Sequence, residues 1–281
     1  MIFRSILIWI FVTSVCIIRY DTCKGFSPTH ELTVHKVGKK YFLEIDKSIL
    51  GRDILIISRI DRSSSNIEFM QDGHNLACQA LIRFELGPNG KIEFKSISAK
   101  AISNDKSENG LYYNVNRLLL SPVIDFFKPI KYGNSKEAYT IDFTTYLLGD
   151  NELLYLDNSS RASIDNKAKF LRENSWIKSV VLKENLVFKT GRQYILENNE
   201  HIALEMTTTF LVLNSEPYKP RYFDERVGFF TSKFVDYDIN PQRIVSKEMI
   251  QRWRLEPKTN DVEKYFKGEL VEPKKPIVFY I

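Results

Sequence analysis

The histidine pair near the start of this sequence is its first candidate for metal chemistry. His30 and His35 bracket the stretch HELTVH, which looks like the zinc-binding motif HExxH but is one residue longer. At this spacing the two side chains would point about 140° apart on a helix. On a strand, an odd spacing places them on opposite faces of the sheet. We therefore expect a surface hairpin with two solvated histidines here, and not a shared metal site.

The other histidines and the paired carboxylates are weaker candidates. His74 and His201 have no second ligand at a metal-binding spacing, although a zinc site assembled from scattered histidines and carboxylates stays open as an alternative. Two acidic pairs could bind calcium or serve as acid and base, namely Asp224 with Glu225 and Asp236 with Asp238. Because no loop of EF-hand spacing contains them, we interpret them as solvated loop charges. The motifs GxSxG, GxGxxG and GxxxxGKS or GxxxxGKT are absent from the sequence.

Cys78 is the one thiol that remains if the first 25 residues are removed, since Cys16 and Cys23 lie within them. One cysteine can form neither an internal disulfide nor a cysteine-based zinc cluster. A catalytic thiol would need a base, and the loop-like QDGHN context of His74 gives little reason to pair the two residues. We expect Cys78 to be buried as a small hydrophobic residue.

Residues 1–25 have the pattern of a secretory signal peptide. Arg4 precedes a mostly apolar run over residues 5–18, which is shorter than the roughly 20 residues of a membrane span. We expect cleavage before Phe26 and export, so that the mature chain is periplasmic, cell-envelope or extracellular and has no membrane span. An uncleaved anchor is the alternative. Cys16 and Cys23 lack the small preceding residue that lipid attachment requires.

Alternating and aromatic segments predict the elements that must hold these residues. The 19 Phe and 14 Tyr favour strands, and the hairpins are expected at 30–37 with 40–45, 80–86 with 91–97, and 192–196 with 201–213. Further strands are expected at 54–57 (buried on both faces), 138–145 and 176–190, while 158–166 is interpreted as a polar connection. Short helices are expected at 111–120 and 260–267. The second should begin at an Asn260 cap and stop at Gly268.

These elements predict a mainly β fold, antiparallel and β-rich with few short helices, in which a C-terminal linker ends in an orphan strand. We divide the chain into a signal peptide (1–25), a β-rich N-terminal domain (26–216) and a linker with a first strand of a further domain (217–281). Residues 248–256 are ambiguous, and we favour a strand that pairs with 276–281. The net charge of +5 shows no basic stripe, and the aromatic strands lack interleaved basic residues, so we expect no nucleic-acid partner.

Several longer sequence motifs resemble the N-terminal region of the large secreted bacterial zinc metalloproteases with a metzincin-like catalytic domain. They are, in order, LGRD at 50–53, SRI at 58–60, RFE at 83–85, FD at 223–224 with RVGFF at 226–230, RWRLEP at 252–257 and EPKKPIVFY at 272–280. The resemblance implies a catalytic domain with the motif HExxHxxGxxH immediately after 276–281. None of those zinc ligands has a counterpart here.

The resemblance therefore implies a non-catalytic region, truncated before the zinc motif, that supports, shields or binds substrate for a catalytic domain. We expect no enzyme activity, no cofactor in this chain, and zinc only in the missing catalytic domain. The expected partners are that domain or a peptide substrate. Two alternatives stay open: a free-standing β-rich binding module of the cell envelope, and one half of a split metalloprotease whose catalytic chain is encoded separately.

Overall fold

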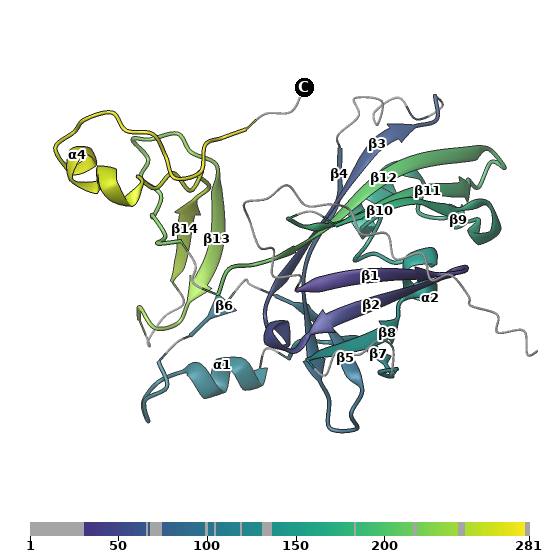
Figure 1. Ribbon diagram of the computed structural model, residues 1–281, viewed down its shortest axis with the longest axis horizontal. Helices are drawn as coiled ribbons and strands as arrows, with labels where there is room; N and C mark the ends of the chain where they lie inside the picture. The colour runs from purple at the N-terminus through teal and green to yellow at the C-terminus, as the bar shows by residue number, and fades with distance from the viewer. Residues whose placement is uncertain are drawn as a thin grey trace, which may run out of the picture. The chain divides into compact units, whose positions relative to one another are not determined.

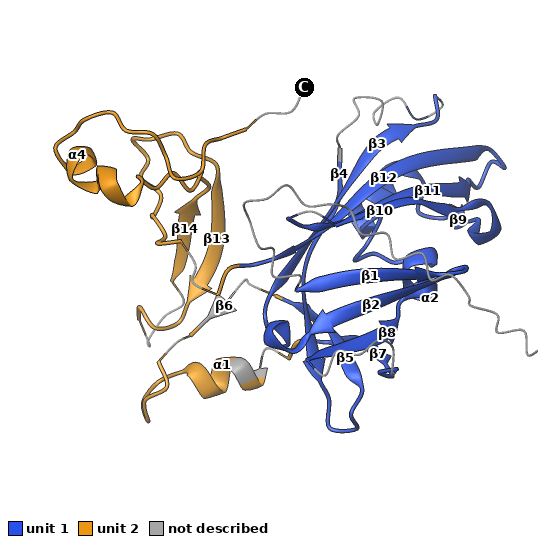
Figure 2. Ribbon diagram, in the orientation of Figure 1, with its two compact units in different colours: residues 1–97, 122–213 blue, residues 98–121, 214–281 orange. Residues whose placement is uncertain are grey.

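The computed structural model describes residues 31–65, 67, 75–98, 101–103, 105–118, 120–130, 137–182, 184–215, 218–240 and 245–278. The expected signal peptide, His30 and His74 lie outside the described residues. The chain forms two compact units (Figure 2). Unit 1 comprises residues 1–97 and 122–213, and unit 2 comprises residues 98–121 and 214–281. The mainly antiparallel β fold with few short helices is confirmed.

Unit 1 contains two sheets, both labelled in Figure 1. The smaller sheet has the order β1-β2-β8, with β1 at Leu32–Val37, β2 at Lys40–Asp46 and β8 at Ala138–Asp142. The larger sheet has the order β10-β11-β12-β3-β4-β5-β7, and β9 also pairs with β11. Its strands are β3 (Ile54–Ser63), β4 (Asn75–Leu86), β5 (Ile92–Ile97), β7 (Val123–Phe127), β9 (Lys169–Phe170), β10 (Trp176–Leu182), β11 (Leu186–Ile195) and β12 (His201–Val212).

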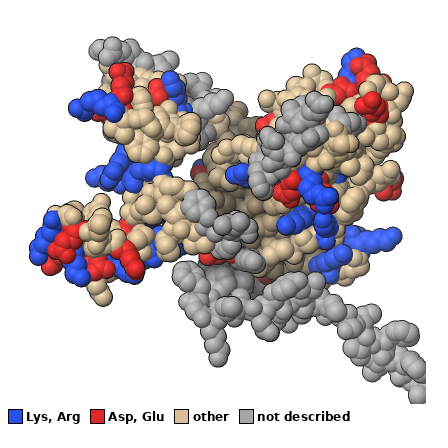
Figure 3. All heavy atoms as spheres, turned by 90° about the horizontal axis from the view of Figure 1, so that it is seen from above, with Lys and Arg blue, Asp and Glu red and all other residues tan. Residues whose placement is uncertain are grey.

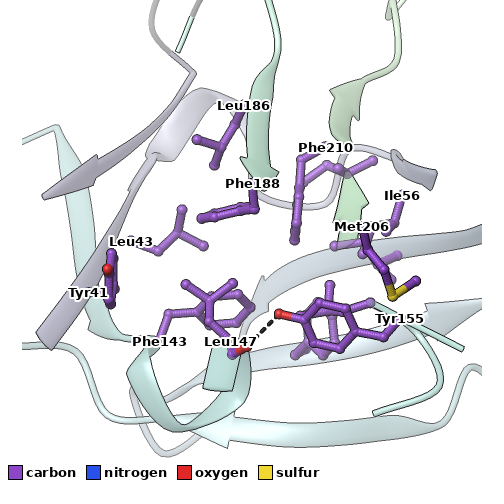
Figure 4. Close-up of a cluster of buried hydrophobic side chains, with 14 of the residues drawn as sticks. Tyr41, Leu43, Ile56, Phe143, Leu147, Tyr155, Leu186, Phe188, Met206 and Phe210 are labelled. Carbon is purple, nitrogen blue, oxygen red and sulfur yellow. Dashed lines mark hydrogen bonds between the residues drawn. The ribbon is translucent and has the colours of Figure 1, made fainter. Parts of the chain in front are cut away.

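A single hydrophobic core joins the inner faces of these two sheets. Strand β12 shows the pattern most clearly, since Leu204, Met206, Thr208 and Phe210 are all buried and the residues between them are half-buried. Figure 4 shows Leu43 of β2 on one side of the core and Phe188 and Phe210 of the larger sheet on the other. The rings of Phe188 and Phe210 pack edge to face at 5.5 Å. Strand β12 thus has the period of two that is expected of a strand with one buried face.

The three expected hairpins are confirmed, and their turns contain residues with positive φ. Gly38 (φ 60°) joins β1 to β2, Gly90 (φ 67°) lies between β4 and β5, and Asn199 (φ 67°) lies between β11 and β12. The predicted strand 176–190 is two strands, β10 and β11, that pair as a hairpin. The stretch 54–57 belongs to a longer strand, and it is fully buried on one face only.

Short helices replace two predicted features of unit 1. The predicted strand 138–145 ends at Asp142, whose carboxylate accepts a hydrogen bond from Thr144 N (3.1 Å), and α2 (Thr144–Leu148) follows. The predicted polar connection contains α3 (Asn158–Ile164), which Asp157 caps by accepting from Ser160 N (2.8 Å). Two short 3-10 helices, η1 (Lys47–Ile49) and η3 (Arg172–Asn174), complete the helices described in unit 1.

Unit 2 is a three-stranded sheet with the order β14-β13-β6, in which β13 and β6 are parallel. Its elements are β6 (Ala101–Ile102), α1 (Tyr112–Leu118), β13 (Thr231–Asp236), β14 (Ser246–Ile250), η4 (Thr259–Asp261) and α4 (Val262–Phe266). Helix α1 confirms the helix expected at 111–120. Of the side chains described in unit 2, only Ser103, Val115 and Phe234 are buried.

The C-terminal part of unit 2 corrects three predictions. Strand β14 ends at Ile250 and pairs with β13, so the favoured pairing of 248–256 with 276–281 is wrong for the described residues. Residues 276–278 form no strand, and 279–281 lie outside the described residues. Helix α4 has Asp261, not Asn260, at its N-cap position, whereas Gly268 (φ 85°) ends it as expected.

Candidate functional site

The histidines described do not form a metal site. His35 lies on β1, and its Nε2 is 2.7 Å from a carboxylate oxygen of Glu44 on the paired strand β2. His201 is exposed at the first position of β12. Among the described residues, no three histidine, cysteine, aspartate or glutamate side chains come together as metal ligands. The prediction that this chain binds no zinc stays a prediction.

The paired carboxylates of unit 2 serve local structure. Asp224 forms an ion pair with Arg226 (2.6 Å), and this pairing lowers the pKa of Asp224. Asp236 accepts a hydrogen bond from Asp238 N (3.1 Å), and Asp238 accepts one from Ser103 Oγ (2.6 Å). Each acidic side chain that the sequence offered as half of a pair, Glu225 aside, is thus bound to a neighbour of its own unit.

The buried polar residues of unit 1 hold a segment that we name the strap (residues 149–157). Thr208, Ser58 and Cys78 are direct cross-strand neighbours on β12, β3 and β4. Ser58 Oγ and Thr208 Oγ1 lie 2.5 Å and 2.9 Å from the carbonyl oxygen of Leu154, and Cys78 Sγ donates to Glu152 O (2.9 Å). Three strands of the sheet therefore present one polar row to the backbone of the strap.

Cys78 confirms the expected buried thiol. Burial raises its pKa to about 12, and the nearby charges of Asp157 and Glu152 act in the same direction. A nucleophilic thiol needs a lowered pKa and access to solvent. The structure therefore gives Cys78 the surroundings of a structural residue.

Arg192 is a buried cation that the sequence reasoning missed. It lies on β11 with 1 % of its surface exposed, and its guanidinium is sandwiched between the rings of Tyr155 (3.7 Å) and Phe170 (4.1 Å). Its Nη2 donates to the carbonyl oxygen of Gly149 (2.6 Å) at the start of the strap and lies 3.7 Å from Asp150 Oδ1. The available signal was a charged residue in the buried register of an otherwise apolar and aromatic strand.

Asp150 links this cation to a second arginine. Its carboxylate accepts hydrogen bonds from Arg161 Nη2 (2.6 Å) and from the Tyr194 hydroxyl (3.1 Å). The cluster fixes the strap against β11 and α3. No ligand-binding chemistry follows from it, because the donors and acceptors named here are directed at one another.

The exposed aromatic residues of unit 2 are the stronger candidate for function. We name five of them the aromatic surface: Tyr222, Phe223, Phe229, Phe230 and Trp253. Phe230 and Trp253 have 87 % and 65 % of their surface exposed. Large apolar side chains that are exposed in such number are typical of protein-binding surfaces on soluble proteins.

Backbone hydrogen bonds place the aromatic surface around the β13–β14 hairpin. Phe223 N donates to Glu248 O (2.9 Å), and Tyr222 forms a bridge with Met249 of β14. Just beyond the Thr231–Ile250 pair at the open end of the hairpin, Gln251 N donates to Phe230 O (2.8 Å). The flanking segments thus extend the two-stranded ribbon, and their aromatic side chains remain exposed.

A closed loop adds further apolar side chains to unit 2. Its neck is held by a bridge between Pro257 and Pro273 and by the ion pair of Lys258 with Glu272 (2.5 Å). The loop contains α4 and exposes Phe266 (81 %) and Leu270. The face in Figure 3 shows acidic and basic side chains intermixed, with wide uncharged areas between them.

Comparison with known proteins gives two family matches. The model described as Domain of unknown function (DUF5117) matches residues 73–258, and the model described as Domain of unknown function (DUF5118) matches residues 31–63. No curated protein and no solved structure matches the chain. Within the described residues, no helix combines the length and apolar character needed to cross a bilayer.

The two matched regions are interleaved in one fold. Residues 31–63 contain β1, β2 and β3, and β3 pairs with β4 on one side and β12 on the other. Strand β2 likewise pairs with β8. The DUF5118 region is therefore built into unit 1 together with strands of the DUF5117 region. Because the DUF5117 model matches more than half of the chain, this protein belongs to the DUF5117 family.

Proposed function

We propose that this chain is a non-catalytic, partner-binding region of an exported zinc metalloprotease lineage, and that unit 2 docks onto the catalytic domain. The observation that carries the proposal is the aromatic surface, which unit 2 exposes while almost none of the apolar side chains described in it are buried. The resemblance to secreted metalloproteases supports the identity of the partner, because the words RVGFF and RWRLEP lie in this surface. Zinc and peptide hydrolysis belong to the catalytic domain in this proposal.

The energetics favour a protein partner for such a surface. Removing one large apolar side chain from water contributes about 1.5–3 kcal/mol, and a few such residues near the centre of an interface dominate binding. The surrounding charges are largely neutralised within unit 2 by ion pairs such as Arg226 with Asp224 and Lys258 with Glu272. An apolar centre with a rim of both signs is typical of protein–protein interfaces and not of nucleic-acid interfaces.

The proposal is tested by co-purification of this chain with a tagged catalytic domain that carries HExxHxxGxxH and comes from the same organism. We expect a stable complex, and Phe230→Asp should weaken it at least about tenfold, because a charge replaces a central apolar contact. Phe126→Asp is the matched control, since Phe126 is also exposed (53 %) but lies on β7 of unit 1. It should leave the complex unchanged.

Two results would contradict the proposal. The first is equal binding by the Phe230→Asp and Phe126→Asp variants. The second is a clear loss of thermal stability in Phe230→Asp measured without any partner, which would show that the aromatic surface is covered within the chain itself. Metal analysis of the purified chain provides a further check, and we expect no stoichiometric zinc and no peptide cleavage.

A further inference from the structure

Arg252 is held in a fixed position next to the aromatic surface. Its guanidinium stacks 3.9 Å above the ring of Tyr218, Nη1 donates to the Tyr218 hydroxyl (2.5 Å), and Nη2 donates to Lys219 O (3.0 Å). The guanidinium of Arg254 approaches the same ring at 5.2 Å. Stacking and two hydrogen bonds already restrict the side chain of Arg252. It therefore loses less conformational entropy on binding a ligand than a freely rotating arginine would.

The charge of Arg252 is not neutralised by its neighbours. Arg254 forms an ion pair with Glu256 (3.0 Å), but Arg252 has no carboxylate partner among the residues described. In the same part of the chain Lys219 and Arg221 also lack an ion pair with any described residue. Ile250 N donates to Arg221 O (3.0 Å), so the segment with Lys219 and Arg221 runs beside the one that leads to Arg252.

This arrangement contrasts with the other cations close to the aromatic surface. Arg226, Lys233 and Lys247 each have a carboxylate within 4.0 Å in unit 2. Among the cations close to the aromatic surface, those without an ion pair to a described residue therefore lie along one strip, which we define as Lys219, Arg221 and Arg252 together with Tyr218. Trp253 follows Arg252 directly in the sequence and has 65 % of its surface exposed, so a large apolar side chain is available at the next position of the chain.

We propose that this strip binds a carboxylate-bearing, partly apolar peptide segment of the partner protein, with Arg252 as the carboxylate receptor. The planar guanidinium matches a carboxylate through paired N–H donors, and such charge-assisted hydrogen bonds are stronger than neutral ones. Trp253 takes an adjacent apolar side chain of the same segment. This inference deepens the proposed function and rests on it for the identity of the partner, whereas the chemistry of the ligand rests on the strip alone.

A peptide segment fits the strip better than a polyanion does. Nucleic acids and anionic membranes are bound by many cations spread over a surface. Here the unpaired cations are few, and the carboxylates of Asp224, Glu225 and Glu256 lie nearby in the sequence. A single acidic side chain flanked by apolar residues satisfies both the charge and the exposed Trp253.

The test uses two synthetic octapeptides of alternating sequence, one of Glu and Leu and the other of Gln and Leu, both acetylated at the N-terminus and amidated at the C-terminus so that carboxylates come from Glu side chains alone. Each is titrated into the full chain by calorimetry. We expect the Glu peptide to bind at least about tenfold more tightly, because only it presents carboxylates. Arg252→Gln should abolish that difference, and Arg252→Lys should retain only part of it, since a lysine cannot form the paired contact.

Two controls separate the site from general electrostatics. Lys267→Gln removes a cation of unit 2 that lies outside the strip, 15 residues after Arg252, and has no ion pair with a described residue, and it should leave the preference unchanged. Tyr218→Leu keeps the charge of Arg252 but removes the stacking, and should weaken binding of the Glu peptide partially. Thermal melts establish that each variant is folded, and the Tyr218→Leu result keeps the proposal testable if Arg252→Gln is unstable.

Three outcomes overturn the inference: equal affinity for the two peptides, an unchanged preference in Arg252→Gln, and displacement of the Glu peptide by millimolar inorganic phosphate, which would indicate a phosphate site. The two proposals fail separately. If the catalytic domain does not bind but the Glu peptide does, the proposed function is wrong and the carboxylate site stands. If the domain binds wild type and Arg252→Gln equally and the peptides do not differ, the site is wrong and the function stands.

Discussion

The two units place their aromatic residues in opposite surroundings. In unit 1, Phe84, Phe94, Phe143, Phe188 and Phe210 are fully buried and pack against one another across the two sheets. In unit 2, the aromatic residues are mostly exposed, and Phe234 is its one buried aromatic residue among those described. A rich aromatic content therefore builds a core in one region and a surface in the other. The difference teaches that composition alone does not separate folding from binding.

The sequence motifs that carry the family resemblance differ between the two units in the same way. In unit 1, LGRD and RFE meet, because Gly51 N donates to Phe84 O (2.9 Å) and Arg83 forms an ion pair with Asp53. Arg52 also donates to Glu31 (2.5 Å) and to Leu213 O (2.6 Å), which ties the first and last strands of the unit. In unit 2, RVGFF and RWRLEP carry the aromatic surface. Sequence motifs that carry the same family resemblance thus stabilise the fold in unit 1 and expose aromatic side chains in unit 2.

The largest expected effect is the loss of stability in Phe188→Ala, which is to be compared with Phe230→Ala. Phe188 is fully buried, and its truncation should lower the free energy of unfolding by about 3–5 kcal/mol, because it leaves a cavity in the core. Phe230→Ala should change it by less than about 0.5 kcal/mol. Urea unfolding of the chain without residues 1–25 measures both. Similar losses in the two variants would contradict the contrast between the units.

The tryptophans allow the two units to be followed separately in that experiment. Trp176 lies on β10 of unit 1 and Trp253 lies in unit 2, while the third tryptophan, Trp9, falls within residues 1–25. With Trp253→Phe the fluorescence reports unit 1, and with Trp176→Phe it reports unit 2. We expect Phe188→Ala to lower the free energy of unfolding that is measured by the fluorescence of Trp176 in the Trp253→Phe background.

Arg192→Ala should have the next largest effect, about 2–3 kcal/mol, on the free energy of unfolding. The substitution removes a buried cation from Gly149 and from its two aromatic rings, but Asp150 keeps its contact with Arg161, so the loss is below that of a fully orphaned buried charge. Lys189→Ala on the exposed face of the same strand is the control and should be nearly neutral. A neutral Arg192→Ala variant would show that the strap does not depend on this cluster.

Ser58→Ala tests the polar row at a smaller scale. We expect a loss of about 1 kcal/mol, since Thr208 still donates to the carbonyl oxygen of Leu154. The double variant Ser58→Ala with Thr208→Val should lose more than the sum of the two single variants, because the carbonyl then has neither donor. Denaturant unfolding of all four proteins measures this coupling, and strict additivity would contradict a shared network.

Cys78 should make the free energy of unfolding depend on pH in alkaline solution and not at neutral pH. Its pKa is raised from 9.0 to about 12, so the folded state keeps the proton that the unfolded state releases. Stability from this group is therefore complete below pH 9 and is lost as the pH rises toward 12. At pH 8 the folded protein should have a roughly thousandfold smaller thiolate fraction than the unfolded protein, and iodoacetamide labelling should be slower accordingly. Rapid labelling of the folded protein would contradict the buried position.

Strand periodicity predicted much of unit 1, because burial of one face imposes a period of two that the residues of β12 and β5 display. The α2 and α3 helices were missed, since the hydrogen bond from Thr144 N to Asp142 and the Asp157 cap of α3 interrupt an extended pattern locally. The expected pairing of 276–281 with 248–256 is wrong for the described residues 276–278, because a short apolar segment does not specify its partner strand. The stacking of Arg192 on Tyr155 and of Arg252 on Tyr218 could not be predicted from sequence, since it joins residues distant in the chain, although the position of Arg192 in its strand indicated burial.

The pairing of β3 has a consequence for the order in which the protein is made. Strand β3 ends at Ser63, yet one of its two neighbours, β12, ends only at Val212. During synthesis β3 therefore leaves the ribosome long before β12, its second pairing partner, has been made. An incomplete chain that stops short of β12 would carry an open apolar strand edge, which invites aggregation. Premature termination or early proteolysis should thus be more harmful to this protein than the loss of its final residues.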